Sequence, residues 1–220
     1  MNRRLCVVGA VVGLVVACSG QSRPTPPALA VGGQTAHSYT GNGPKVVVLG
    51  DSLTVRSWTE TYDDLTNDHA VMAAAWDGEG YGGGPLSARL GGLLLPDAAK
   101  TYATTHPDVA VLALGTNDVW VSTRDIHGAL LEMVAMVDEL KPACLVGVTI
   151  PETSVLGDWN GTNARVLNDA MRGWANKVVD WAAISRQRGI TGPDHVHPTK
   201  QGAERRAAAI ASAVRSCTSS

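Results

Sequence analysis

Val46-Val47-Val48-Leu49-Gly50-Asp51-Ser52-Leu53 joins an apolar run to a tight turn. Four consecutive apolar residues followed by Gly-Asp-Ser are typical of a buried strand that turns directly into a helix. A serine at the carboxyl end of such a strand lies in the crevice where open parallel sheets bind ligands. Ser52 is therefore a candidate nucleophile. An ordinary helix cap formed by Asp51 or Ser52 is the alternative explanation of this turn.

Short apolar or β-branched runs alternate with longer helical patterns along the rest of the chain. The runs predict strands over residues 45–49, 70–74, 109–114, 145–150 and 178–181. Helices are predicted over 54–65, 122–140 and 163–176, and a last helix carries the apolar stripe Ala203, Ala207, Ile210 and Val214. This alternation predicts an α/β fold, in which a parallel sheet is covered by helices on both faces.

The length and charge of the chain limit the classes of protein to consider. A chain of 220 residues suffices for one α/β domain with a full core. The net charge of -2 leaves no basic surface of the kind that binds nucleic acid. We therefore expect a monomeric single-domain protein with no nucleic-acid partner.

The N-terminus has the pattern of an export signal. A short positive start precedes the apolar stretch 5–17, which is too short to span a bilayer. Val15-Val16-Ala17-Cys18 is similar to the lipobox of bacterial lipoproteins, in which the cysteine receives the lipid. Ordinary signal cleavage after Ala17 is the alternative. Either pattern predicts a protein outside the cytoplasm, held at the cell envelope by a lipid on Cys18 or secreted.

Composition divides the chain into a signal, a tether and a domain. Residues 1–18 form the predicted lipoprotein-type signal peptide, and residues 19–43, rich in Ser, Thr, Pro and Gly, form a flexible tether. Residues 44–220 form the domain. It holds Cys144 before a predicted strand and Cys217 after the last helix, which can form a disulfide outside the cytoplasm or remain two separate thiols.

Two further segments follow strands at the same predicted edge. Gly115-Thr116-Asn117-Asp118 ends the third strand, so the Asn117 amide can face an oxyanion beside Ser52 if the first and third strands are neighbours. A simple turn is the alternative. After the second strand comes a glycine-rich segment, in which Gly78, or alternatively Gly80, can present a backbone N–H as a second oxyanion donor. The alternative there is a flexible surface loop.

Asp194-His195-Val196-His197-Pro198 lies just before the last helix. An aspartate three residues before a histidine can, in a turn, contact Nδ1 of His197 and leave Nε2 facing a nucleophile. His195 is the alternative base, but adjacent Asp and His side chains generally point apart, which favours His197. The pair His195 and His197 also suggests metal ligands. Since no third His or Cys is clustered with them, no metal is expected.

These blocks, in this order, resemble those of the SGNH hydrolases, also called the GDSL esterase and lipase family. The resemblance covers the chain after the tether and implies a flavodoxin-like three-layer α/β/α sandwich around a five-stranded parallel sheet. It implies that catalysis needs no cofactor. The implied site comprises Ser52 as nucleophile, His197 as base and then acid, Asp194 as the residue that orients it, and an oxyanion hole from the Ser52 N–H, the Gly78 or Gly80 N–H and the Asn117 side chain.

The function implied by the resemblance is hydrolysis of a small-molecule or glycan carboxylic ester through an acyl-Ser52 intermediate. Val179-Asp180-Trp181 is similar to the catalytic domains of bacterial cell-envelope O-acyltransferases and sugar O-acetyl esterases in the same superfamily. This similarity favours a short acyl group. Two alternatives are a cell-envelope O-acyltransferase with the same triad and a catalytically silent module that binds the envelope.

Overall fold

One parallel sheet, with strand order β2-β1-β3-β4-β5, organises the protein. The structure is a computed structural model, and it describes residues 39–75, 95–119, 126–157 and 159–219. The strands are β1 (Lys45–Gly50), β2 (Ala70–Ala75), β3 (Val109–Ala113), β4 (Cys144–Val148) and β5 (Lys177–Val179). The chain order reverses at β1, which lies between β2 and β3, so a ligand crevice is expected where β1 and β3 end.

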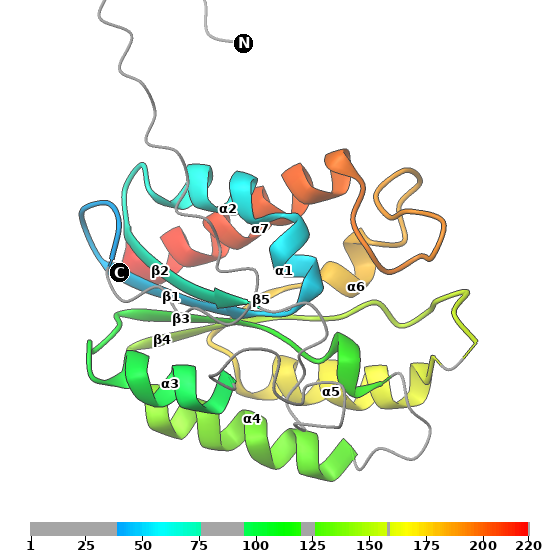
Figure 1. Ribbon diagram of the computed structural model, residues 1–220, viewed down its shortest axis with the longest axis horizontal. Helices are drawn as coiled ribbons and strands as arrows, with labels where there is room; N and C mark the ends of the chain where they lie inside the picture. Colours follow the sequence, from blue (N-terminus) through cyan, green and yellow to red (C-terminus); the bar gives the residue numbers. More distant parts are fainter. Residues whose placement is uncertain (1–38, 76–94, 120–125, 158, 220) are drawn as a thin grey trace, which may run out of the picture.

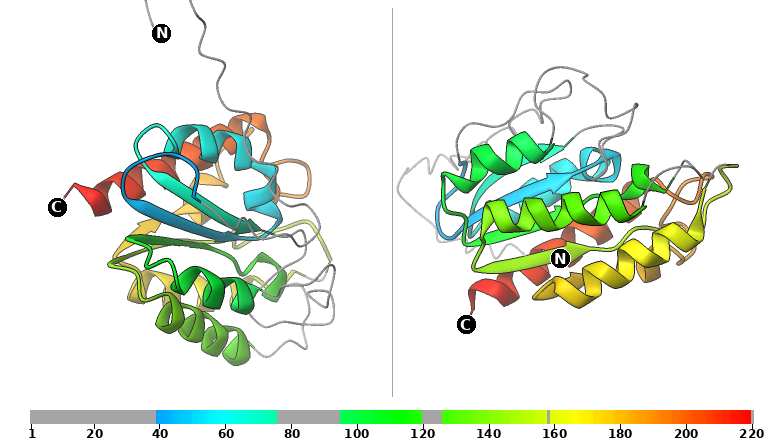
Figure 2. Two further views of the ribbon diagram at one scale, coloured as in Figure 1. Left: turned by 60° about the vertical axis from the view of Figure 1, so that its left-hand side comes forward. Right: turned by 90° about the horizontal axis from the view of Figure 1, so that it is seen from below.

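Helices cover both faces of this sheet (Figure 1). One face carries α1 (Ser52–Arg56), α2 (Trp58–Leu65), α6 (Trp181–Ile184) and α7 (Lys200–Thr218). The other carries α3 (Leu95–Ala103), α4 (Ile126–Leu140) and α5 (Gly161–Trp174), which Figure 2 shows as one layer. The expected three-layer α/β/α sandwich is thus confirmed.

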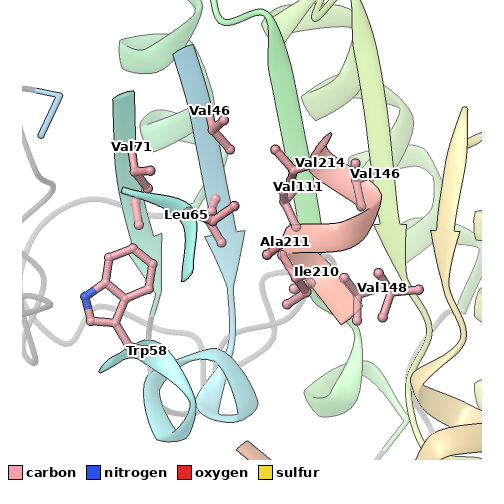
Figure 3. Close-up of a cluster of buried hydrophobic side chains, with 14 of the residues drawn as sticks. Val46, Trp58, Leu65, Val71, Val111, Val146, Val148, Ile210, Ala211 and Val214 are labelled. Atoms are coloured by element: carbon pink, nitrogen blue, oxygen red, sulfur yellow. The ribbon is translucent and has the colours of Figure 1, made fainter. Parts of the chain in front are cut away.

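The apolar run of β1 is continuous because both of its faces are buried. Val47 and Leu49 belong to the core under α3, α4 and α5, whereas Val46 and Val48 belong to the core under α2 and α7, in which Figure 3 labels Val46. Burying one such side chain stabilises a fold by about 1.5 to 3 kcal/mol. β1 therefore holds the following turn in a fixed place.

The helices differ from the sequence predictions in three places. The helix predicted over 54–65 is divided at Ser57, whose hydroxyl donates to the Leu53 carbonyl at 2.9 Å. The last strand ends at Val179, and Trp181, predicted as its end, begins α6 because the Asp180 side chain accepts from the Ala183 N–H. α3 was not predicted. Of the helix predicted over 122–140, residues 122–125 lie outside the described ranges.

The folded domain begins earlier than residue 44. Thr40, assigned to the tether, pairs with Val71 of β2 through backbone hydrogen bonds of 2.9 and 2.8 Å. The Tyr39 hydroxyl lies 2.7 Å from the Thr105 hydroxyl. The composition of 19–43 is uniform, so it does not reveal that these two residues lie against the edge strand.

A disulfide joins Cys144, at the start of β4, to Cys217, near the end of α7, with their Cα atoms 5.9 Å apart. The bond ties the last helix to the sheet. Within the described ranges, no helix has both the length and the apolar character needed to cross a membrane.

Candidate active site

The first part of the site is the nucleophile turn, residues 50–57. Asp51 caps α1 by accepting from the Leu53 N–H at 3.1 Å, so the capping explanation of this aspartate holds. α1 lies so close to β1 that a Cβ at Gly50 would be 2.1 Å from Oγ1 of Thr54. Only glycine fits there. Ser52, the first residue of α1, is 4% exposed.

Asp51 also ties the nucleophile turn to the end of β3. Its Oδ2 accepts from the Thr116 N–H at 3.2 Å, in the short 3₁₀ helix η1 (Thr116–Asp118). Gly115, just before η1, has a φ of 116°, which favours glycine. Burial raises the pKa of the Asp51 carboxyl, although contact with Thr116 and the charge of Arg206 act in the opposite direction.

A buried arginine supports this turn from behind. Arg206, on α7, is 1% exposed, and its guanidinium donates to the Ser57 hydroxyl at 2.9 Å and the Thr54 hydroxyl at 3.2 Å. Burial lowers its pKa to about 10, against the opposing effect of Asp51. Arg206 therefore carries a positive charge at neutral pH and favours the ionised form of the capping aspartate, against the effect of burial.

The second part of the site is the base loop, residues 191–198. The loop is closed on itself, because the Gly192 N–H donates to the His197 carbonyl at 2.8 Å and Thr191 pairs with Pro198. Asp194 Oδ1 accepts from the backbone N–H groups of Val196 and His197, both at 3.0 Å. Its Oδ2 lies 2.6 Å from Nδ1 of His197.

These contacts set the charge state of Asp194. Burial acts to raise the pKa of its carboxyl, but the hydrogen bonds from the His197 ring and from the backbone of Val196 and His197 outweigh it. The pKa of Asp194 therefore lies below its ordinary value. An ionised Asp194 keeps the ring proton on Nδ1 and leaves Nε2 of His197 as the acceptor.

The two parts meet at Ser52, whose Oγ lies 3.1 Å from Nε2 of His197. The structure thus connects Ser52, His197 and Asp194 by two hydrogen bonds. This arrangement can move a proton from the serine hydroxyl to the imidazole while the carboxylate stabilises the resulting imidazolium. The side chain of His195, the alternative base, is exposed and lines a separate cavity.

The oxyanion residues are described in part. Asn117 lies in η1, half-buried, where β3 ends beside β1, so the condition that the first and third strands are neighbours is met. Gly78 and Gly80 fall outside the described residues. Within the described ranges no three His, Cys, Asp or Glu side chains come together as metal ligands.

Sequence reasoning missed two supports of the site. Arg206 lies on the same helix face as Ala203, Ala207 and Ile210, so a charged residue on a buried stripe was the available signal. Ser154, after β4, donates to the Asp194 carbonyl at 3.0 Å. No pattern indicates that contact, because the two residues are distant in the chain.

Comparisons with solved structures agree with this architecture. An aryl esterase of M. smegmatis, in an inhibitor-bound form, is 19% identical with a TM-score of 0.63, over 80% of this chain and 100% of that one. A carbohydrate acetylesterase from Sinorhizobium meliloti is 17% identical with a TM-score of 0.62, over 79% and 99%. A GDSL-like lipase from Bacteroides thetaiotaomicron is 17% identical with a TM-score of 0.62, over 78% and 88%. At such identities these likenesses establish the fold.

The sequence itself decides the family. No curated protein matches the chain in sequence. Residues 48–205, however, match the GDSL-like lipase/acylhydrolase family, and this range begins in β1 and ends in α7. The chain therefore belongs to the GDSL-like lipase/acylhydrolase (SGNH) family and is a serine hydrolase that acts on ester bonds.

Proposed function

We propose that this hydrolase removes short acyl groups, including O-acetyl groups of carbohydrates, through an acyl-Ser52 intermediate. The observation that carries the proposal is the 3.1 Å contact between Ser52 Oγ and His197 Nε2, with Asp194 behind the imidazole at 2.6 Å. Nucleophile, base and orienting carboxylate then stand in the order that acyl transfer requires.

In the proposed reaction, Nε2 of His197 takes the Ser52 proton as Oγ attacks the ester carbonyl carbon. The carbonyl oxygen becomes an oxyanion, which accepts hydrogen bonds from the Ser52 N–H, the Gly78 or Gly80 N–H and the Asn117 amide. The tetrahedral intermediate expels the alcohol, which leaves with the proton from His197.

Water then completes the cycle. Nε2 of His197 takes a proton from the water molecule as its oxygen attacks the acyl-Ser52 carbonyl. Collapse of the second tetrahedral intermediate breaks the bond to Oγ, which takes the proton back from His197. The carboxylic acid leaves, and Ser52 is ready for another ester.

Two observations support a short acyl group and a carbohydrate substrate. A carbohydrate acetylesterase and a carbohydrate esterase of family 3 are among the matching structures. Val179-Asp180-Trp181, which runs from the end of β5 into α6, is the segment similar to cell-envelope O-acyltransferases and sugar O-acetyl esterases, and it supports a short acyl group.

The test compares Ser52→Ala with Ser216→Ala on 4-nitrophenyl acetate, butyrate and octanoate, and on acetylated xylan. Ser216 is exposed near the end of α7 and, among the described residues, bonds only to the Ala213 carbonyl of its own helix, so its variant is the matched control. We expect wild-type kcat/KM to fall with acyl length, and Ser52→Ala to lose about 10⁴-fold or more. A fluorophosphonate probe should label the control but not Ser52→Ala. Wild-type turnover in folded Ser52→Ala would refute the assignment.

We also propose that the protein is exported and anchored by lipid on Cys18. The signal pattern of residues 1–18 supports export, and so does the Cys144–Cys217 disulfide, since such bonds persist in oxidising compartments. The test follows incorporation of labelled palmitate and membrane fractionation in wild type and Cys18→Ser. Label and membrane association should both disappear in the variant; retention of either contradicts the anchor.

A further inference from the structure

A cavity lies beside the base loop, and Ser52, Asp194 and His197 are not among its lining residues. Its volume is about 350 Å³, and its wall comes from the segment after β4, the segment after α6 and the base loop. Figure 1 shows α6 and the segment that follows it at the end of the sheet where α1 begins. We call this cavity the arginine pocket, after Arg186 and Arg188. Its lining also includes Thr153, Thr191 and His195.

The arginine pocket carries excess positive charge. Arg186 Nη1 lies 3.7 Å from Glu152 Oε2, and the same carboxylate lies 3.9 Å from a guanidinium nitrogen of Arg172. Arg172 also pairs with two aspartates, at 3.0 and 3.3 Å, so Glu152 remains as the partner of Arg186. Within the described residues, Arg188 makes no hydrogen bond or ion pair. A planar guanidinium without a carboxylate partner is a ready bidentate donor to an oxyanion.

The backbone of the base loop turns His195 toward this pocket. His195 has a φ of 61°, in the left-handed region that favours glycine, and its N–H donates to the Gly192 carbonyl at 3.0 Å. Val196, between the two histidines, is buried. His197 reaches Ser52, whereas His195 lines the arginine pocket. Two residues of chain span at most about 7 Å, so the Cα atoms of the histidine at Ser52 and of the histidine at the arginine pocket lie close together.

We propose that the arginine pocket binds a carboxylate or phosphate group on the alcohol portion of the substrate. The hydrolase would then select acyl esters of anionic carbohydrates, with the acyl group at Ser52 and the anion held by Arg188, Arg186 and His195. This inference rests on the proposed esterase function and names its substrate class. The polar wall suits an oxyanion, since Thr153 adds a hydroxyl donor beside the guanidinium groups.

The experiment uses one O-acetylated galacturonic acid oligosaccharide in two forms, with free carboxylates or with carboxylates converted to neutral amides. Acetate release is measured at low ionic strength, because salt screens exposed charges. For the wild type we expect kcat/KM to be about 10- to 100-fold higher on the free acid, mainly through KM, as for hydrogen bonds to a charged group. Arg188→Gln should bring this acid-to-amide ratio close to one.

Arg205→Gln is the matched control. Arg205 is an exposed arginine of α7 that does not line the pocket, so its variant should keep the wild-type ratio. Continued acetate release from the amide by Arg188→Gln shows that the variant is folded. A wild-type ratio near one, or a ratio that Arg188→Gln and Arg205→Gln change equally, overturns the arginine pocket as an anion site.

A competition arm distinguishes the two sources of the anion. Sodium phosphate and sodium galacturonate are compared as inhibitors of free-acid hydrolysis, with sodium chloride at equal ionic strength as reference. Stronger inhibition by either one in wild type, lost in Arg188→Gln, supports the pocket and identifies its ligand class; no inhibition by either overturns it. If the wild type hydrolyses neither oligosaccharide nor 4-nitrophenyl acetate, the esterase function itself fails, which is a separate result.

Discussion

The nucleophile turn and the base loop supply the two halves of one site, yet they are held in opposite ways. Asp51, Ser52, Thr54 and Ser57 are all buried, and α1 presses against β1 at Gly50. Asp194 and His197, by contrast, have side chains that are 28% and 22% exposed. Ser52, the proposed nucleophile, is positioned by the packed core, whereas His197, the proposed base, is positioned by hydrogen bonds within its own loop.

The pKa values of Asp51 and Asp194 are shifted in opposite directions by these two environments. Burial raises the pKa of Asp51, and its role is structural, because it accepts from the Leu53 and Thr116 N–H groups. Hydrogen bonds from His197 lower the pKa of Asp194 despite its partial burial. Proximity to Ser52 in the chain is therefore not the basis on which Asp194 is proposed as the catalytic carboxylate; the basis is its contact with the His197 imidazole.

The largest effect is expected from removing the base. His197→Asn should lower kcat/KM on 4-nitrophenyl acetate by about 10⁴-fold or more while the fold persists, since the nucleophile turn does not depend on this ring. His106→Asn is the control: His106 is exposed, and its φ of 51° is one that asparagine tolerates. Equal losses in both variants would mean that the ring of His197 acts only through folding.

The next effect concerns the end of β3, which the nucleophile turn holds through Asp51. Asn117→Ala should lower kcat by about 10² to 10³-fold with little change in KM, because the amide is proposed to bind the oxyanion only as it forms. Steady-state kinetics on 4-nitrophenyl acetate measure the two constants. A loss smaller than tenfold would remove Asn117 from the oxyanion hole.

A third prediction tests whether the core holds the nucleophile turn. Arg206→Met removes the donor to Thr54 and Ser57 and leaves Asp51 without its nearby positive charge. We expect the free energy of unfolding, measured in urea, to fall by about 3 kcal/mol. Arg205, the exposed neighbour of Arg206, provides the control. Arg205→Met should change the free energy of unfolding by about 0.5 kcal/mol or less.

The corresponding substitution in the base loop should lower the free energy of unfolding by a smaller amount. Ser154→Ala removes the hydroxyl that donates to the backbone carbonyl of Asp194 and accepts from the Leu156 N–H, and we expect the free energy of unfolding to fall by about 1 kcal/mol. If Ser154→Ala destabilised the protein more than Arg206→Met, the base loop rather than the core would be the stronger support.

The smallest effect is a pH dependence of opposite sign at the two aspartates. The folded-state pKa of Asp194 lies below the ordinary 3.8, so its contribution to stability is present above that value and is lost as the pH falls through the folded-state pKa. The pKa of Asp51 lies above 3.8, so ionising it costs stability as the pH rises from 3.8 through the folded-state pKa.

Urea unfolding from about pH 7 to about pH 3 measures both slopes. The stability advantage of wild type over Asp194→Asn should shrink on acidification. Over the same range the stability of Asp51→Asn relative to wild type should fall. Slopes of the same sign would contradict the contrast between the two carboxyl groups.

Sequence patterns predict the sheet of this protein well because its strands are buried on both faces. Val46 to Leu49 are apolar without interruption, and each predicted strand lies within a few residues of an observed one. α3 was missed, and Trp181 was assigned to a strand. A short apolar run cannot be told from a short buried helix by periodicity, although Asp180 offered a capping signal.

The contacts of the site also differ in how well the sequence predicts them. The spacing of Asp194 and His197 anticipates their contact because both lie in one short turn. The contacts of Arg206 with Thr54 and Ser57 were not anticipated, since they join segments about 150 residues apart that only packing brings together. Contacts within one turn can thus be predicted from the sequence, whereas contacts with a helix distant in the chain cannot.

The Cys144–Cys217 bond has a consequence for where the enzyme is stable. It spans 73 residues of sequence, a stretch that contains α5, β5 and the base loop. Closing a loop of that length is worth about 4 kcal/mol in the chain-entropy account, a large part of the net stability of an ordinary domain. Because reducing compartments keep cysteine thiols in the reduced form, this stabilisation exists only under oxidising conditions. The free energy of unfolding of this hydrolase therefore depends on the redox state of its surroundings.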